Sequence, residues 1–185
     1  MTSKSFCIYG ASEANSINNG LHLRTINVSD LSNLREWKNS NKIRFFYQFD
    51  ISSAEQLAWF QRYSNCEDDF MFIVVNKSMI SVGCIGLRLH LDGSYEIYNV
   101  ILGDTRFGGK GLMAYAMGLV LRFCFQLNAS SVWLYVLLGN PAIRWYLKRG
   151  FIQLETFDKS LKMLYDISDS GGYHNDFSIW FSGWQ

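Results

Sequence analysis

The chain has 185 residues, of which 49% are hydrophobic and 16% aromatic, so it can bury a substantial core and is too apolar to be disordered. Seventeen basic residues against sixteen acidic ones give a formal net charge of +1, which indicates neither nucleic acid nor an anionic membrane as a partner. The four cysteines and three histidines are scattered and match no disulfide framework or zinc spacing, so we expect reduced thiols and no metal.

The N-terminal 20 residues are polar and rich in Ser and Asn, which is typical of a loosely ordered arm, although residues 6–9 could add a short edge strand. We assign residues 21–185 to a single domain. No signal peptide is indicated, and the apolar run 119–127 is interrupted by Arg122 and Gln126 and is therefore no membrane span. We expect a cytoplasmic location.

The hydrophobic pattern predicts strands alternating with helices. In chain order these are a strand at 21–28, helices after Ser29-Asp30 and after Ser52, meander strands at 71–75, 79–89 and 95–102, a helix at 112–127, a strand at 131–138, a helix at 141–148, and strands at 151–157 and 177–181. This order predicts an α/β fold of the α+β type.

The stretch Ile101 to Met113, ILGDTRFGGKGLM, joins an apolar strand to a helix through a glycine-rich turn. Glycines allow close backbone approach, and a helix N-terminus offers unpaired N–H groups, so the turn suits a phosphate or pyrophosphate. No Ser or Thr follows the Gly-Lys pair and no third glycine follows Gly111, so neither a Walker loop nor a dinucleotide fingerprint fits. The alternative is a plain structural turn.

Two motifs resemble the GNAT superfamily of acetyl-CoA-dependent N-acetyltransferases, and most of all its amino-sugar and ribosomal-protein subgroup. FGGKGLM resembles the family's Q/R-x-x-G-x-G/A turn, and NPAIRWYLKRGF resembles its N-x-x-A-x-x-x-Y-x-x-x-G-F pattern. Together with LREWKN, the resemblance covers about residues 21–181. It implies the GNAT fold, a mixed and mostly antiparallel sheet flanked by helices, in which two splayed strands form the cofactor cleft.

Two registers of the glycine turn are open. Aligned on GKGLM, Gly108 takes the Gln/Arg position and Met113 the last small position, and we prefer this register. The alternative, Arg106-x-x-Gly109-x-Gly111, fits literally but would shift the start of the helix. In the second motif, Asn140 lies six residues before Tyr146, one fewer than in the family pattern.

The resemblance implies acetyl-CoA as the cofactor. Main-chain groups of one strand end should pair with the pantetheine arm, and the glycine turn should hold the pyrophosphate. The cofactor-binding residues implied are Val100, Ile101, Leu102, Gly108, Gly109, Lys110, Gly111, Leu112, Met113 and Asn140.

In the implied reaction, a neutral amine attacks the acetyl thioester and coenzyme A thiolate leaves. Tyr146 matches the family position of the acid that protonates the thiolate, although a core tyrosine would look the same. Glu96 matches the position of the family's base, with His90 and Asp92 as reserves near the same hairpin. A glutamate on an exposed strand face is the alternative for Glu96.

Trp37-Lys38-Asn39 and Arg44, followed by Trp59-Phe60, resemble a W-R-N…R…W-F pattern of GNAT members that acetylate nucleotide-linked amino sugars for surface polysaccharides or glycans. The acceptor residues that this resemblance implies are Trp37, Asn39, Arg44 and Trp59. Such a lining suits a nucleotide sugar, because aromatic rings stack on a nucleobase such as uracil and Arg pairs with the diphosphate. The tryptophans also sit at helical positions that would pack a core. The expected partner is thus a small-molecule amine, and the aromatic C-terminal tail leaves a homodimer open.

Two other functions stay open at this point. One is acetylation of protein N-termini of the ribosomal-protein type, which the same subgroup contains. The other is coenzyme A binding without catalysis.

Overall fold

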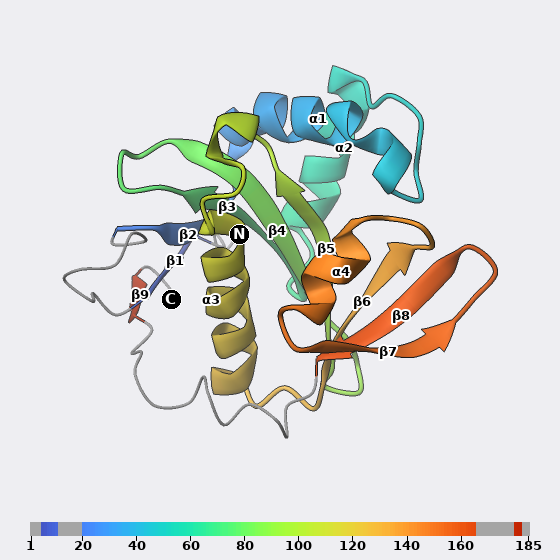
Figure 1. Cartoon of the computed structure of the whole chain (residues 1–185). Helices are drawn as coiled ribbons and strands as arrows, with labels where there is room; N and C mark the ends of the chain where they lie inside the picture. Colours follow the sequence, from blue (N-terminus) through green and yellow to red (C-terminus); the bar gives the residue numbers. More distant parts are fainter. Residues whose placement is uncertain (1–4, 11–19, 166–179, 183–185) are drawn as a thin grey trace.

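The computed structural model describes residues 5–10, 20–165 and 180–182 (Figure 1). Nine strands in these ranges form one sheet in the order β7-β8-β6-β5-β4-β3-β2-β1-β9. Their bounds are β1 Cys7–Tyr9, β2 His22–Thr25, β3 Asp69–Val75, β4 Ser81–Leu89, β5 Tyr95–Leu102, β6 Val132–Leu137, β7 Phe151–Thr156, β8 Ser160–Tyr165 and β9 Trp180–Ser182. All neighbouring strands run antiparallel except β5 and β6.

Helices cover both faces of the sheet. They are α1 Leu31–Ser40, α2 Ser53–Ser64, α3 Leu112–Gln126 and α4 Ala142–Leu147. Figure 1 shows α3 crossing one face, while α1 and α2 lie together on the other. No helix in the described ranges is long and apolar enough to cross a membrane.

The alternation of β3 explains this arrangement. Phe72 and Val74 pack in the core cluster that includes the buried face of α3. Met71 and Ile73, one position away, pack in a second cluster with Trp37 of α1. Because successive strand residues point to opposite faces, a strand buried on both sides becomes a continuous apolar run.

The feature that positions the site is the divergence of β5 from β6. The two strands pair in parallel only at Tyr95↔Val132 and Glu96↔Trp133. Further along β5, the pairing with β4 shifts register between Cys84 and Gly86, and Asn99 adopts a left-handed φ of 47°. The last part of β5 therefore has a paired edge toward β4, and an edge toward β6 that no described strand fills. In Figure 1, α4 lies against the diverging strand ends.

Several predicted elements differ in the structure. The helix predicted after Ser29-Asp30 is present as α1, whose N-cap is Asp30, but the Asp30 side chain makes no capping hydrogen bond. The side-chain cap lies earlier, where Asn27 accepts from the Ser29 N–H and begins the short 3-10 helix Val28–Asp30. Strand β8 follows β7 after a short turn and was not predicted, although its buried residues alternate. The short strand expected at 6–9 is present as β1, next to β2.

The remaining expectations near the termini are only partly covered. Of the strand expected at 177–181, residues 177–179 lie outside the described residues, and β9 pairs with β1. The rest of the expected arm, residues 1–4 and 11–19, also lies outside them.

Candidate active site

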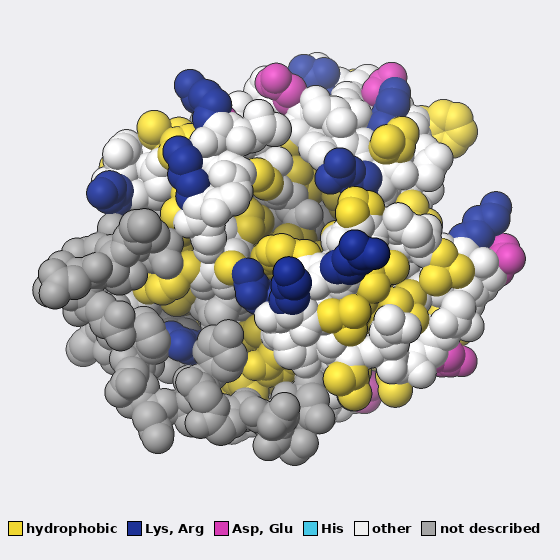
Figure 2. All heavy atoms as spheres, viewed as in Figure 1, with side chains coloured by type: hydrophobic (Ala, Val, Ile, Leu, Met, Phe, Trp, Pro, Cys, Tyr) yellow, Lys and Arg dark blue, Asp and Glu magenta, His cyan; other side chains and the backbone are white. Residues whose placement is uncertain are grey.

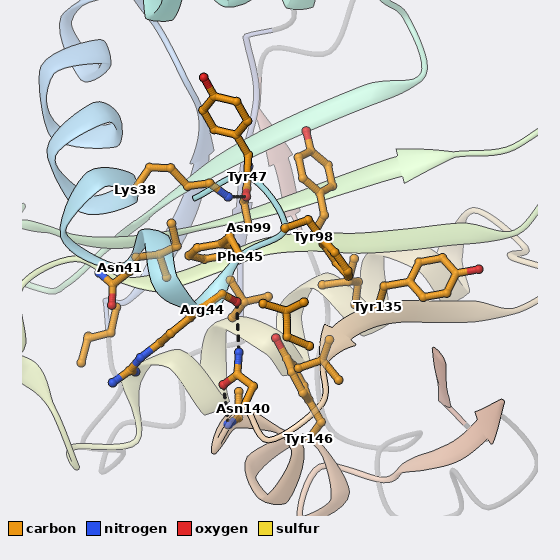
Figure 3. Close-up of a pocket in the computed structure, with 18 of the residues that line it drawn as sticks. Lys38, Asn41, Arg44, Phe45, Tyr47, Tyr98, Asn99, Tyr135, Asn140 and Tyr146 are labelled. Atoms are coloured by element: carbon orange, nitrogen blue, oxygen red, sulfur yellow. Dashed lines mark hydrogen bonds between the residues drawn. The ribbon is translucent and has the colours of Figure 1, made fainter. Parts of the chain in front are cut away.

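Two adjoining cavities open where β5 and β6 diverge. The first, which we call the strand cavity, has a volume of about 590 Å³ and lies between β5, β6 and the segment 44–47 (Figure 3). The second, the turn cavity, has a volume of about 520 Å³ and lies against the glycine turn and α4. They form one cleft, because both are lined by the same five residues, Arg44, Val100, Leu102, Ala142 and Tyr146.

The glycine turn has the geometry of an anion-binding loop. Gly109 and Gly111 have left-handed φ values of 71° and 77°, and helix α3 begins at Leu112, directly after Gly111. A Cβ added to either glycine would meet no atom within 4 Å, so both positions face open space beside the turn cavity. The four N-terminal N–H groups of a 15-residue helix thus point toward an open cradle.

The backbone angles favour the second of the two registers of the turn. The two left-handed glycines are those of the Arg106-x-x-Gly109-x-Gly111 pattern, and the helix start needs no shift in that register. The preferred register instead placed Met113 at a small-residue position, but Met113 lies inside the first turn of α3. The Arg106 side chain forms an ion pair with Asp104 and lowers the pKa of that carboxyl group.

The other residues predicted to bind the pyrophosphate differ in whether they line the turn cavity. Gly108 has an ordinary φ of −59° and lines neither cavity. The Lys110 ammonium lies 5.0 Å from the Phe107 ring centroid. Leu112 and Met113 line the turn cavity. A cation that sequence reasoning missed, Arg149 after α4, lines the same cavity.

The predicted strand segment Val100, Ile101 and Leu102 lines the strand cavity as one wall. On its inner side it pairs with β4, as Cys84↔Ile101 and Gly83↔Leu102. On its outer side β6 has already diverged, so main-chain groups face the cleft instead of another described strand. An extended ligand can pair with such an edge as an added strand does.

Tyr146 of α4 sits at the junction of the two cavities. Its side chain is buried, with its ring 5.6 Å from that of Phe151, and this burial raises the pKa of its phenol. The hydroxyl is protonated at neutral pH with or without this shift, because a free phenol has a pKa of about 10. Asn140 shapes the turn before α4: its amide donates to the Arg44 carbonyl at 3.1 Å, and its Oδ1 accepts from the Ala142 N–H.

Glu96 lines the strand cavity near the point where β5 leaves β6. Its carboxylate lies 3.3 Å from the Arg88 guanidinium and 3.4 Å from His90 Nε2. The two alternative bases, His90 and Asp92, do not line the cavity. His90 packs on Trp133, and Asp92 accepts from the Ser94 N–H in the hairpin turn.

Three of the four predicted acceptor residues do not reach the cleft. Trp37 is buried in the core between α1 and the sheet, and Trp59 stacks on Tyr63 of the same helix. Asn39 exchanges two hydrogen bonds with the main chain of Ile51 and so fixes the loop before α2. Arg44 alone lines both cavities.

Lys38 stands at the Arg position of the W-R-N pattern and was not among the four predicted acceptor residues, yet it reaches the cleft. Its side chain lines the strand cavity, donates to Asn99 Oδ1 and lies 3.4 Å from the Phe45 ring centroid. Phe45, Phe46, Tyr47, Tyr98 and Tyr135 complete an aromatic lining. Among the residues that the structure describes, no three His, Cys, Asp or Glu side chains gather closely enough to hold a metal ion.

Comparison with known proteins agrees with this geometry. The family model described as "Acetyltransferase (GNAT) domain" matches residues 20–151. No curated protein sequence matches the chain. Many solved structures are similar in fold, among them the three that follow.

FdhC, titled a nucleotide-linked sugar GNAT, has 19% identity and a TM-score of 0.68, over 79% of this chain and 86% of that one. Spermidine N-acetyltransferase from Vibrio cholerae, solved with CoA and spermine, has 21% identity and a TM-score of 0.68, over 79% and 96%. A domain from Methanocaldococcus jannaschii has 19% identity and a TM-score of 0.67, over 78% and 97%.

The predicted fold class is confirmed by these neighbours and by the mixed sheet. The family model covers most of the chain, including the glycine turn and α4. The chain therefore belongs to the GNAT acetyltransferase family and is an N-acetyltransferase that uses acetyl-CoA as its donor.

Proposed function

We propose that the protein acetylates the amino group of a nucleotide-linked amino sugar. The observation that carries this proposal is the charge of the strand cavity. Lys38 and Arg44 line it, and the one acidic residue that lines it in the described part of the chain, Glu96, is already paired with Arg88. A polyamine acceptor would need unpaired carboxylates in this cavity. The diphosphate of a nucleotide sugar binds to cations instead, and its nucleobase stacks on aromatic rings.

The charge distribution on the surface supports the same proposal. Figure 2 shows Lys and Arg side chains gathered around the hollowed middle of one face, with Asp and Glu side chains toward its rim. Cations around a cleft raise the local concentration of anionic ligands. An acceptor that carries a diphosphate fits this field better than a polycation.

The cleft fits the cofactor that the family uses. The open cradle at Gly109 and Gly111 would hold the pyrophosphate, with Arg149 beside it, and the outer edge of Val100–Leu102 would hold the pantetheine arm. A side chain at either glycine would fill the cradle. Bound acetyl-CoA supplies the acetyl thioester that acylates the amine.

The reaction needs two proton transfers, one from the amine and one to the leaving thiolate, and different residues of the cleft carry them out. We assign to the Glu96 carboxylate the acceptance of the proton that the amine must lose, directly or through water. The Arg88 guanidinium holds that carboxylate in place. We assign to the Tyr146 hydroxyl, at the junction of the cavities, the donation of a proton to the leaving thiolate.

The test is calorimetric titration with acetyl-CoA, followed by a thiol-release assay over a panel of amines. The panel contains UDP- and dTDP-linked amino sugars, spermidine, and ribosomal-protein N-terminal peptides. We expect binding of acetyl-CoA and thiol release with a nucleotide sugar. Release with peptides alone, or with spermidine alone, would replace the proposed acceptor class.

A further inference from the structure

Lys38 occupies an unusual place for a lysine. It comes from the second half of α1, and its ammonium joins three elements: its own helix, Asn99 at the bulge of β5, and Phe45 after the Lys42–Arg44 turn. Figure 3 shows the Lys38 side chain reaching toward Asn99, whereas the Arg44 side chain extends away from Asn99. Because an ammonium has three donors, the Asn99 bond leaves others for a ligand in the cavity.

The ammonium has no anionic partner in the described part of the chain. No carboxylate there lies within ion-pair distance of Lys38. Glu96 lines the same cavity, but its carboxylate is paired with Arg88 and lies near His90. An unpaired cation beside a cavity is stabilised by an anion that enters it.

The other titratable groups around Lys38 do not neutralise it. Burial raises the pKa of the Cys84 thiol to about 12, so that group is uncharged at neutral pH. Arg44 adds a second positive charge to the cavity, and Tyr47 adds a phenol. Burial also lowers the pKa of Lys38 itself to about 8.

We propose that the Lys38 ammonium binds the phosphate groups of the acceptor and thereby selects anionic acceptors over polycationic ones. This inference rests on the proposed function and adds to it the residue that sets specificity. It also implies that binding of the acceptor and protonation of Lys38 are coupled. Lys38 has a pKa of about 8 in the unliganded protein, and a bound phosphate raises this pKa so that the proton is retained.

This coupling fixes the direction of the pH dependence. The anion binds well only when Lys38 is protonated. The apparent affinity therefore falls as the pH rises through the pKa of Lys38 in the unliganded protein. For a pKa near 8, affinity should be about tenfold weaker at pH 9 than at pH 7. At pH 8, binding should take up about half a proton per site.

The probe is UDP-N-acetylglucosamine, a nucleotide sugar whose amine is already blocked, titrated by calorimetry into protein saturated with coenzyme A. The coenzyme fills the glycine turn, so the probe's phosphates cannot bind there. Its diphosphate diester has no proton to lose between pH 7 and 9. Titration in two buffers of different ionisation enthalpy gives the proton uptake.

Three variants complete the design. Lys38→Met keeps an unbranched side chain of similar shape without the charge, and should weaken binding of the probe about tenfold or more at pH 7. Lys38→Arg keeps the charge at every pH and should bind the probe with no pH dependence from 7 to 9. Lys42→Met is the matched control, because Lys42 pairs with Asp50 outside the cavity.

The outcomes separate the two proposals. Equal probe affinity in Lys38→Met, with coenzyme A affinity and melting temperature unchanged, would overturn the role of Lys38. So would an affinity of the unmodified protein that is constant from pH 7 to 9. No binding of the probe to the coenzyme-loaded protein would count against the nucleotide-sugar acceptor on which the role of Lys38 rests. Failure to bind coenzyme A, or thiol release with spermidine alone, would instead count against the proposed function itself.

Discussion

The Glu96 carboxylate and the Arg88 guanidinium lie 3.3 Å apart on neighbouring strands, directly opposite each other in the β4–β5 register. Arg88 also donates to Asp69 of β3, so one guanidinium links carboxylates on both sides of its strand. The Glu96 side chain is thereby fixed at the point where β5 leaves β6. A fixed carboxylate at the mouth of the cleft is placed to receive a proton from an amine.

Glu96→Gln should lower kcat about 100-fold at pH 7, because the amide keeps the size of the side chain but accepts no proton. The loss should shrink at pH 9, where more of the acceptor amine is already neutral. Thiol release measured at both pH values with the best amine of the panel tests this. Glu155→Gln, on the exposed face of β7, is the matched control. A loss of equal size at both pH values would contradict the role as base.

Tyr146→Phe should lower kcat about 100-fold while changing acetyl-CoA affinity less than threefold, because only the proton donor is removed. Single-turnover thiol release and calorimetry measure the two quantities separately. Tyr165→Phe is the matched control: its ring is also buried and also packs on Phe151, at 5.4 Å, but it lines neither cavity. Unchanged turnover in Tyr146→Phe would remove the acid role.

Gly111→Val should weaken acetyl-CoA binding more than about tenfold, because the new side chain would occupy the open cradle. A valine at a left-handed φ also strains the backbone, so a control must carry the same strain. Gly93→Val provides it, since Gly93 has the same φ of 77° in the β4–β5 turn, away from both cavities. Calorimetry on both variants decides, and equal affinities would show that the turn does not hold the cofactor.

The glycine turn and the strands around it were predictable because local sequence determines them. Gly109 and Gly111 supply the two left-handed residues, and an apolar run ends before them. Strand β8 was missed because only three residues separate it from β7, too short a connection to mark a new strand, and the predicted strand ended at residue 157. The alternation of Leu161, Met163 and Tyr165 was the signal available.

The acceptor side of the cleft was less predictable, and Trp37 and Lys38 show why. Successive residues of an α-helix point about 100° apart, so two neighbours on α1 face different surroundings. Trp37 faces the sheet and is buried there, while Lys38 faces the cavity. Which of the two faces the cleft depends on how α1 crosses β5, and this crossing is a tertiary contact that no local pattern encodes.

The packing role of Trp37 predicts a specific coupling with Gly103. A Cβ built on Gly103 would lie 2.1 Å from the Trp37 ring, so Gly103→Ala should destabilise the protein by about 1–3 kcal/mol through overpacking. Trp37→Leu alone should also destabilise, because it leaves a cavity beside Gly103. In the double variant, the methyl group that Gly103→Ala introduces would fill part of that cavity.

The double variant should therefore be more stable than the sum of the two single effects predicts, by about 1 kcal/mol or more. Urea unfolding of the four proteins of the cycle measures this coupling. Gly118→Ala, in the interior of α3, is the control partner, since its added Cβ meets nothing within 4 Å. Strict additivity between positions 37 and 103 would contradict the packing role, and the indole would again be a candidate for contact with the acceptor.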